Sequence, residues 1–310
     1  MTESTPTVFC LPDDKHVPVE EGYNLLQALL IAGINVAHAC GGNARCSTCR
    51  LHILTGAENC EPRTAAEQEM AERLKFDDSI RLACQTRIKG EVAARRLILD
   101  TEDEENASQL EEGNMGEAIG REATATVLFA DVKSFTSLSD VLPPYDVIHL
   151  LNRYFRRAGA AIQRNGGHVD CYIGDGILAV FRWEEHEDAT LRAVKAGLDL
   201  LEVATGISGY VESWYGRGFE IRVGIHSGPV VAGRLGDATM QRDTIIGDTV
   251  NTASRIENAC KEAGVPFLIS APCMEMVRDS VEAGRTFALE LRGKEGTHDL
   301  HEITGLKGDS

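Results

Sequence analysis

The sequence predicts an α+β protein made of two compact units with an acidic segment between them. The N-terminal part alternates short strand and helix patterns, and the C-terminal part has strand and helix patterns in the order β-α-β-β-α-β. Between Arg96 and Arg121 there is no Lys or Arg, whereas eight Asp and Glu residues occur there. Like charges repel and keep such a segment extended. We therefore expect domains at 1–99 and 122–310, joined by a linker at 100–121.

Short strands and helices follow one another in the N-terminal unit. Pro12-Asp13-Asp14 separates two stretches in which apolar and polar residues alternate, the pattern of a hairpin. A helix follows, with four leucines on one face and Gly33 as its stop. The expected strands are Thr7–Leu11, His16–Val19, Arg50–Leu54 and Glu91–Leu97, and the expected helices are Tyr23–Ala32 and Ala65–Leu74. Together these elements indicate a small α+β roll.

The C-terminal unit alternates longer strands and helices. Its first long helical pattern places Val147, Leu150 and Tyr154 on one face, and Gly174-Asp175-Gly176 marks a tight hairpin turn. The order of elements is that of a ferredoxin-like core with additions. The expected strands are Thr124–Ala130, His168–Ile173, Ile177–Phe181, Phe219–His226 and Val230–Gly233, and the expected helices are Tyr145–Gln163, Asp188–Ala204 and Asp248–Ala263.

The composition argues against several classes of function. The formal net charge is −17 and aromatic residues make up 5% of the chain, so we expect no nucleic-acid partner. The same deficit of basic residues disfavours docking on an anionic membrane, and no apolar run is long enough to span a bilayer. The N-terminus has no signal-peptide pattern, so we expect a cytoplasmic protein. Its nine cysteines are then thiols or metal ligands rather than disulfides.

Four of the nine cysteines form a ligand pattern. Cys40, Cys46 and Cys49 lie on one short loop, and Cys84 follows after 34 intervening residues. Three thiolates on a loop plus a distant fourth are typical of an iron–sulfur centre, whereas zinc sites with four cysteines usually come as two close Cys pairs. The two glycines after Cys40 allow the positive φ angles and close backbone approach that wrapping around sulfide requires.

The segments ACGGNARCSTCR and RLACQ resemble those of 2Fe–2S ferredoxins of β-grasp fold, over about residues 5–99. The five-residue gap before the second cysteine is closer to the adrenodoxin type than to the plant type. The resemblance implies one 2Fe–2S cluster per chain, held by the four cysteines of the pattern, with structural zinc as the alternative. Cys10 and Cys60 lie outside the pattern, and we expect them to be ordinary buried thiols.

Two carboxylates stand where the edge of a sheet could hold Mg²⁺. Asp131 ends an apolar strand pattern, and Asp175 lies at the tip of a hairpin turn. Adjacent antiparallel strands can bring both to one edge, and two carboxylates sharing two metal ions are what a two-metal phosphoryl-transfer site needs. The helix start after Asp131 offers N–H groups to phosphate oxygens. Each motif is weak alone, since most Gly-Asp-Gly sequences are ordinary turns.

A third stretch adds an amide and a guanidinium. Asn251 and Arg255 are four residues apart at the start of an expected helix, so they share one of its faces. An amide beside a guanidinium can orient a ribose and stabilise charge on a transferring phosphorus. Standing alone, this stretch would be an ordinary helix with a solvated arginine.

Together these stretches resemble the catalytic domain of class III nucleotidyl cyclases. The likeness covers about residues 122–304 and runs through FADVKSFTSLSD, YIGDGILAVF, VGIHSGPVVAG, IIGDTVNTASRIE and LRGKEG. It implies that Asp131 and Asp175 hold two Mg²⁺ or Mn²⁺ ions per site, assisted by the carbonyl of Val132.

The same resemblance assigns the contacts to the nucleotide. It places Phe135 and Thr136 on the turn around the triphosphate and Lys294 at the terminal phosphates. Asn251 would position the ribose, and Arg255 would stabilise the pentacovalent phosphorus. The implied reaction is attack of the ribose 3′ oxygen on the α-phosphorus with loss of pyrophosphate. Members of this class work as head-to-tail dimers in which the carboxylates of one chain meet the Asn and Arg of the other, so we expect a homodimer.

This sequence departs from the family pattern at the pair of positions that reads the base. Those positions fall on Cys171 and Thr244. Adenylate-forming members usually have Lys at the first and Asp or Thr at the second, whereas guanylate-forming members usually have Glu and Cys. Thr244 therefore indicates ATP, but a thiol at position 171 cannot reproduce the contact of a Lys ammonium with a purine nitrogen.

Four interpretations of Cys171 are open. The site takes ATP weakly, with water in place of the Lys; it takes another base, a pyrimidine or guanine; it is impaired, by nature or by an introduced substitution; or Cys171 is itself a redox-sensitive thiol. The first expectation is ATP, with 3′,5′-cyclic AMP and pyrophosphate as products.

The fusion of the two units indicates a regulated enzyme. Reduction changes the charge of the cluster by one unit, and a resulting difference of about 1–3 kcal/mol is enough to shift a two-state equilibrium. We therefore expect the cluster to be a redox input, served by a redox partner, and the cyclase to be the output. Two rival hypotheses are an electron carrier with an inert cyclase-like dimerisation half, and a module that binds nucleotide without converting it.

Overall fold

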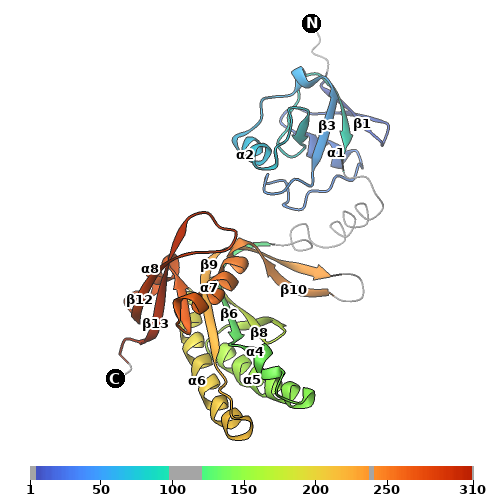
Figure 1. The fold of residues 1–310 in the computed structure, drawn as a ribbon. Coiled ribbons are helices and arrows are strands. Elements are labelled where there is room, and N and C mark those ends of the chain that lie inside the picture. The colour runs from blue at the N-terminus through green and yellow to red at the C-terminus, as the bar shows by residue number, and fades with distance from the viewer. Residues whose placement is uncertain (1–4, 98–120, 237–240, 309–310) are drawn as a thin grey trace. The chain divides into compact units, whose positions relative to one another are not determined.

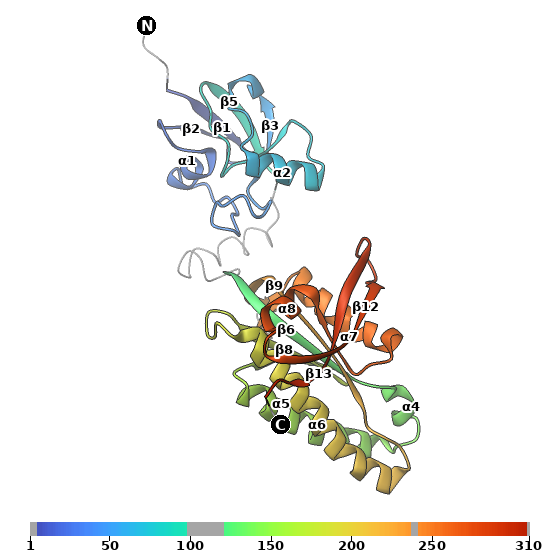
Figure 2. The same cartoon turned by 90° about the vertical axis from the view of Figure 1, so that its left-hand side faces the viewer.

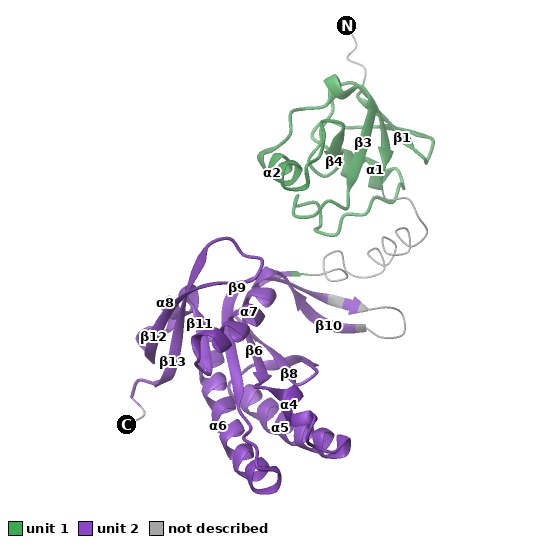
Figure 3. Cartoon of the chain, in the orientation of Figure 1, with its two compact units in different colours: residues 1–121 green, residues 122–310 purple. Residues whose placement is uncertain are grey.

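The computed structural model (Figure 1) describes residues 5–97, 121–236 and 241–308. The chain forms two compact units, residues 1–121 and 122–310, which are coloured separately in Figure 3. The predicted acidic linker lies almost entirely outside the described residues. None of the described helices combines the length and the hydropathy needed to cross a bilayer.

The N-terminal unit is a five-stranded mixed sheet with two helices. Its strand order is β2-β1-β5-β3-β4, with β1 and β5 parallel and the other neighbours antiparallel. The strands are β1 (Thr7–Leu11), β2 (Lys15–Pro18), β3 (Arg50–Thr55), β4 (Ile80–Leu82) and β5 (Glu91–Arg96), the helices are α1 (Leu25–Ile31) and α2 (Ala65–Leu74), and a 3-10 turn, η1, spans Ala57–Asn59. The predicted β-grasp arrangement is confirmed.

Alternate residues of β1, β3 and β5 are buried in the core beneath α1. The buried set includes Val8, Cys10, Leu51, Ile53, Val92 and Ala94 of the strands and Leu25 and Leu29 of the helix. α1 begins at a capping box, in which the Gln27 N–H donates to the Asn24 side chain at 2.9 Å and the Asn24 N–H donates to the Gln27 side chain at 3.1 Å. Cys10 is buried as expected, whereas Cys60 is only half-buried.

The C-terminal unit is built on an eight-stranded sheet. Its path is β12-β13-β11-β9-β6-β8-β7, and β10 pairs with β9 beside that path. The strands are β6 (Arg121–Val132), β7 (His168–Ile173), β8 (Gly176–Arg182), β9 (Ile221–Gly236), β10 (Gln241–Ile246), β11 (Phe267–Ser270), β12 (Val281–Glu290) and β13 (Thr297–Leu306), and the helices are α4 (Phe135–Ser139), α5 (Pro144–Arg164), α6 (Ala189–Tyr215), α7 (Asp248–Ala263) and α8 (Ala271–Val277). The segment β6-α5-β7-β8-α6-β9 confirms the predicted order.

Helices cover both faces of this sheet, as Figure 2 shows. α5, α6 and α8 share the main core with one face, and α7 packs with the other. Gly224 of β9 permits the close approach of α7, because a Cβ at this position would lie 2.2 Å from the Glu257 nitrogen and 2.6 Å from the Ala253 oxygen. The α7 side chains that face the sheet are thereby fixed relative to the edges of β6 and β8.

Candidate functional site

Asp131 and Asp175 meet at one edge of the sheet. Ala130 of β6 lies opposite Ile177 of β8 in antiparallel register, so the end of β6 and the β7–β8 turn lie together. The two carboxyl groups are hydrogen-bonded to each other. Burial, followed by the charge of Asp175, raises the pKa of Asp131 from 3.8 to about 6. Two carboxylates in contact repel when both ionise, and a divalent cation between them relieves that repulsion.

The turn that carries Asp175 is shaped by glycine. A Cβ at Gly176 would lie 3.3 Å from Oδ1 of Asp131 and 3.2 Å from the Ile173 carbonyl, and Gly174 has φ +61°. A larger residue at position 176 would therefore press on the Asp131 carboxylate. The sequence predicted a tight turn here, and the structure adds that the second glycine makes room for the acid pair.

The residues expected around the triphosphate follow directly after the acid pair. Val132 is buried, and Ser134, with φ +56°, leads into α4, which begins at Phe135. Phe135 packs against the core and Thr136 is exposed. The end of β6 and the first turn of α4 thus stand next to the two carboxylates.

The donor set fits a metal that is shared with substrate. In the part of the chain that the structure describes, no three His, Cys, Asp or Glu side chains are grouped so as to hold a metal ion. Two carboxylates do not complete the coordination of a divalent ion. Its remaining oxygen ligands would come from the Val132 carbonyl, water and nucleotide phosphates. Mg²⁺ is usually bound in this way, by one or two carboxylates plus phosphate and water.

A buried ion pair lies near the acid pair. Nε of Arg222 on β9 is 3.1 Å from Oε1 of Glu257 on α7, and Glu257 is buried. Burial, followed by the charge of Asp131, raises the pKa of Glu257 to about 7, while Arg222 lowers the pKa of both Asp131 and Glu257. This pair was not predicted from sequence, although Glu257 ends one quoted motif and Arg222 directly precedes another.

Asn251, Arg255 and Lys294 form a second group. Asn251 is exposed on the first turn of α7, and Lys294 lies between β12 and β13. The Asp248 carboxylate is hydrogen-bonded to Nζ of Lys294 and is 3.8 Å from Nη1 of Arg255. This Nη1 is buried and has no hydrogen-bond partner among the described residues. The group therefore presents two cations and an amide, with one guanidinium nitrogen still able to bind an anion.

His226 lies behind this group and is uncharged at neutral pH. Its Nδ1 is 2.8 Å from Oγ of Ser270. Burial, followed by the charge of Lys294, lowers the pKa of His226 to about 4. At neutral pH the lysine and the arginine therefore supply positive charge next to Asp248, and His226 does not.

Cys171 and Thr244 lie in a third group, where β7 approaches β10. The Thr244 hydroxyl donates to Oδ2 of Asp170 at 2.7 Å, and the Cys171 thiol is hydrogen-bonded to the side chains of Asp170 and Arg242. Burial and then the charge of Asp170 raise the pKa of Cys171, so the thiol is protonated at neutral pH. Sequence analysis found the cysteine and the threonine but missed their two charged neighbours.

The structure thus arranges the expected nucleotide residues in three groups. The acid pair lies at the end of β6 and the β7–β8 turn, the amide and cations lie on α7 and the β12–β13 loop, and the base-reading pair lies between β7 and β10. In the described residues, no hydrogen bond or ion pair joins the carboxylates of Asp131 and Asp175 to Asn251 or Arg255 within one chain.

In the N-terminal unit the four cysteines of the pattern form two pairs. Cys40 is hydrogen-bonded to Cys46, and Cys49 to Cys84. A cluster of two irons needs two thiolates on each iron, so the pairing fits a 2Fe–2S cluster better than it fits a single tetrahedral ion. The loop wraps as predicted, with φ +65° at Gly41 and +86° at Gly42.

Hydrogen bonds in this loop favour ionised sulfur at two of the four positions. Burial opposes ionisation of Cys40, but N–H groups of Arg45, Asn43 and Cys46 point at its sulfur and lower its pKa overall. The Cys49 thiol lowers the pKa of Cys84 to about 6. Backbone amides that donate to sulfur also stabilise a bound cluster and tune its potential.

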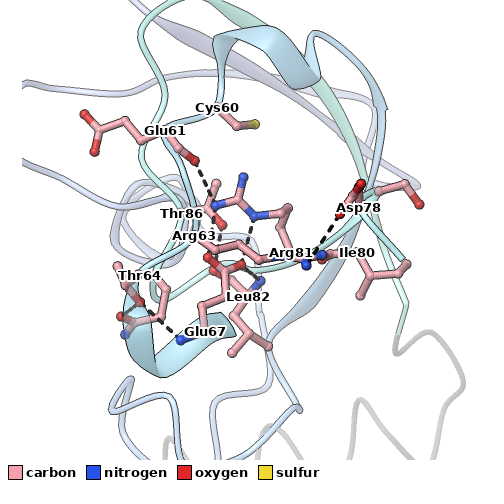
Figure 4. A network of polar contacts seen from close by, with 12 residues as sticks. Cys60, Glu61, Arg63, Thr64, Glu67, Asp78, Ile80, Arg81, Leu82 and Thr86 are labelled. Atoms are coloured by element: carbon pink, nitrogen blue, oxygen red, sulfur yellow. Dashed lines mark hydrogen bonds and ion pairs between the residues drawn. The ribbon is translucent and has the colours of Figure 1, made fainter. Parts of the chain in front are cut away.

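A polar network supports the fourth cysteine, Cys84, and Figure 4 shows the part of it around Glu67 and Arg81. Both Glu67 oxygens accept hydrogen bonds of 2.9 Å from Arg81, and Oε1 also accepts the Leu82 N–H at 2.8 Å. Thr64, the N-cap of α2, donates to Gln85, whose amide donates to the Gly42 carbonyl and to the Cys84 sulfur. The network ties α2 to both segments that carry cysteines.

Comparison with known proteins assigns the family. Residues 118–302, more than half of the chain, match the family described as adenylate and guanylate cyclase catalytic domain, and residues 8–89 match the 2Fe-2S iron-sulfur cluster binding domain. The chain belongs to the class III cyclase family. Its N-terminal unit matches an iron–sulfur domain rather than a zinc domain, so the expected fusion is confirmed.

The relatives of this cyclase include both base specificities. It is 33% identical over 192 residues to the adenylate cyclase of Anabaena cylindrica, covering 57% of this chain and 36% of that protein. It is 34% identical over 167 residues to the receptor-type guanylate cyclase gcy-19 of Caenorhabditis briggsae, covering 53% of this chain and 13% of that protein. The crystal structure of the guanylyl cyclase Cya2 superposes with a TM-score of 0.57 and 27% identity, covering 61% of this chain and 96% of that one. The chain thus spans about a third or less of the length of these two curated relatives.

Proposed function

We propose that this cyclase converts ATP to 3′,5′-cyclic AMP and pyrophosphate, in a homodimer that needs two divalent metal ions per site. The observation that carries the proposal is the contact between Asp131 and Asp175 at the open edge of the sheet. Burial and mutual repulsion at this edge oppose ionisation of the pair, and a divalent cation favours it. Bound Mg²⁺ or Mn²⁺ would polarise the ribose 3′ hydroxyl and neutralise charge on the phosphates.

The reaction joins the ribose 3′ oxygen to the α-phosphorus and breaks the bond from that phosphorus to the β-phosphate oxygen. The 3′ hydroxyl proton passes to solvent, and pyrophosphate leaves. Asn251 orients the ribose, and Arg255 stabilises the charge that develops on the oxygens of the α-phosphorus. When the nucleotide binds, the Lys294 ammonium leaves the Asp248 carboxylate and binds the terminal phosphates. Backbone N–H groups at Phe135 and Thr136 bind the phosphates beside the acid pair.

A second copy of the chain would complete each site. The acid pair and the α7 group lie on different elements, and in a head-to-tail pair the acids of one chain would face the amide and guanidinium of its partner. Large apolar side chains are also exposed on β7 and β10, which carry the base-reading residues, and on β9, which pairs with β10. They are Tyr172 and Ile173 on β7, Val231 and Leu235 on β9, and Ile246 on β10. Such a patch favours a protein interface.

The redox state of the cluster would set the rate of the cyclase. The four cysteines and the acid pair belong to two units of one chain, so a change of cluster charge would have to be transmitted from one unit to the other to bias a dimer equilibrium. Purified protein is compared, without oxygen, before and after reduction with dithionite. We expect the rates to differ by about fivefold or more, as a coupling of about 1 kcal/mol implies. Equal rates would contradict redox regulation and leave the cyclase reaction untouched.

The test of the reaction is an assay with all four nucleoside triphosphates in Mg²⁺ and in Mn²⁺, with products separated by chromatography. We expect cyclic AMP as the main product. A main product other than cyclic AMP would contradict the choice of base. A protein that carries the cluster and accepts electrons but forms no cyclic product would instead be the electron carrier with an inert second half.

A further inference from the structure

The strand that carries the base-reading position has a bulge. Val169 of β7 lies opposite Ala179 of β8, but Cys171 lies opposite Leu178, the next residue, so Asp170 is the extra residue. In a regular strand Asp170 and Cys171 would point to opposite faces of the sheet. The bulge lets the two side chains reach two partners on one other strand.

Those partners lie on β10. Thr244 donates its hydroxyl to Asp170 at 2.7 Å, and Arg242 is hydrogen-bonded to the Cys171 thiol. Arg242 and Thr244 are two residues apart, so they project from the same face of the strand. Thr244 is buried and Arg242 is exposed, which puts the guanidinium at the open side of this group.

This inference rests on the proposed cyclase reaction and concerns only how the base is read. We propose that Arg242 supplies the hydrogen-bond donor that Cys171 cannot, and that Asp170 together with Thr244 supplies the acceptor, so that the site reads adenine. A thiol is shorter than a lysine side chain, and the Arg242 guanidinium from β10 is hydrogen-bonded to it. Arginine stays charged at every working pH and offers several donors in one plane.

The base that fits is decided by the order of donors and acceptors. The edge of adenine presents an acceptor, N1, beside an amino donor, N6, and it needs a protein donor next to a protein acceptor. Guanine presents two adjacent donors, N1 and N2, which are best met by a carboxylate with both oxygens open. Here Oδ2 of Asp170 already accepts the Thr244 hydroxyl, and the Cys171 thiol also contacts this carboxylate. The arrangement therefore favours adenine over guanine.

The experiment removes the guanidinium and then restores a cation at the position of the cysteine. Arg242→Ala is expected to lower kcat/KM for ATP by about tenfold to a hundredfold, mainly through KM, because a paired base contact is worth about that much discrimination. The double variant Cys171→Lys with Arg242→Ala is expected to recover most of that loss. Asp170→Asn is expected to lower the ratio of ATP to GTP turnover. Arg164→Ala, which removes an exposed arginine paired with Asp199 on the helical face, is the matched control.

The outcomes separate this inference from the cyclase proposal. If the wild type forms cyclic AMP and Arg242→Ala leaves both KM and the ATP preference unchanged, the inference is overturned and the reaction stands. If no triphosphate is cyclised, the proposed function fails, and calorimetry with a non-cyclisable ATP analogue still tests the base contact through weaker binding by Arg242→Ala. A preference for GTP or CTP in the wild type overturns the assignment of adenine.

Arg242→Gln, which keeps length and polarity, is measured alongside, with thermal melting as the check on folding.

Discussion

The carboxyl groups of Asp131 and Asp175 lie in hydrogen-bonding contact, although two helices and a strand separate them along the chain. The contact exists because β6 and β8 are antiparallel neighbours and because Gly176 leaves room beside Asp131. Everything proposed about metal binding and cyclisation depends on this contact. It is also the relationship that makes the following two predictions specific.

Removal of either carboxylate should abolish product without affecting the cluster. We expect Asp131→Ala and Asp175→Ala to lower kcat by about a thousandfold or more, because a two-metal site cannot assemble on one carboxylate. The visible absorbance of the iron–sulfur centre reports the N-terminal unit, and it should remain at the wild-type level. Asp199→Ala, on the helical face of the same unit, is the control. Residual activity of Asp131→Ala within tenfold of wild type would exclude the acid pair as the metal site.

The same pair predicts a dependence of stability on pH. The folded-state pKa of Asp131 is about 6, above its usual value of 3.8. The metal-free folded state therefore binds more protons than the unfolded state between about pH 4 and pH 6, so this group's contribution to the free energy of unfolding falls as pH rises through that window. Since Asp131 is only half-buried, we expect a loss on the order of 1–2 kcal/mol above pH 6.

Two measurements check this sign. Asp131→Asn should raise the melting temperature of metal-free protein at pH 7.5 and have little effect at pH 4, while abolishing product. Mg²⁺ should raise the melting temperature of the wild type more at pH 7.5 than at pH 5, because binding needs both carboxylates ionised. A melting temperature of Asp131→Asn below that of the wild type at pH 7.5 would contradict the predicted sign.

Cluster binding should distinguish ligand cysteines from other cysteines of the same unit. Cys46→Ser and Cys84→Ser each remove one member of a thiol pair, and we expect both variants to lose the visible absorbance and most bound iron. Cys60→Ser is the matched control, since that half-buried thiol lies outside the four and should leave iron content unchanged. Full iron occupancy in Cys84→Ser would contradict the proposed ligand set.

Predictability from sequence differed between elements for physical reasons. α7 and β7 were predicted to the residue, because glycines lie directly before and after both elements. α6 was expected to end at Ala204, since Gly206 and Gly209 follow, but Ile207 and Val211 are buried and continue its apolar stripe to Tyr215.

The strands show a similar limit. β9 was expected as two strands around Gly228-Pro229, yet it continues through both residues. β10, β12 and β13 were not expected, because most of their residues are exposed or half-buried and show little alternation.

The candidate site shows what a linear motif contains and what it lacks. The acid pair could be expected from sequence, because a strand end and a hairpin tip tend to meet. Asp170 could not, because a one-residue bulge changes its direction without any signal in the sequence. Arg242 belongs to no motif, and only the pairing of β10 with β9 brings it to Cys171.

The buried pair Glu67–Arg81 should be essential to the N-terminal unit. Glu67→Ala leaves Arg81 buried and unpaired and removes the acceptor of the Leu82 N–H, so we expect a loss of about 3–5 kcal/mol in the free energy of unfolding, with loss of the cluster. Replacement of both residues by apolar side chains of similar size, Glu67→Leu with Arg81→Met, should recover much of that loss. Glu69→Ala, on the exposed face of α2, is the control. Denaturant unfolding followed by circular dichroism gives the free energy of unfolding of all four proteins, and visible absorbance reports which of them hold the cluster.

Asp248 should regulate how tightly the cations hold phosphate. Its carboxylate is hydrogen-bonded to Lys294 and lies 3.8 Å from Arg255, so it competes with phosphate oxygens for both. The Lys294 hydrogen bond lowers the pKa of Asp248, which stays ionised throughout the working range of pH. Asp248→Asn removes the charge but keeps an oxygen at the start of α7, and we expect inhibition by pyrophosphate to become about two- to fivefold tighter, in line with an exposed ion pair.

The control is Asp243→Asn, one residue beyond Arg242 on β10, which removes an acidic side chain of the same unit outside the α7 group. Weaker inhibition by pyrophosphate in Asp248→Asn would mean that the carboxylate positions the two cations rather than competing for them. In that case kcat should fall together with the affinity for pyrophosphate. Measuring the inhibition constant and kcat on the same preparation therefore distinguishes competition from positioning.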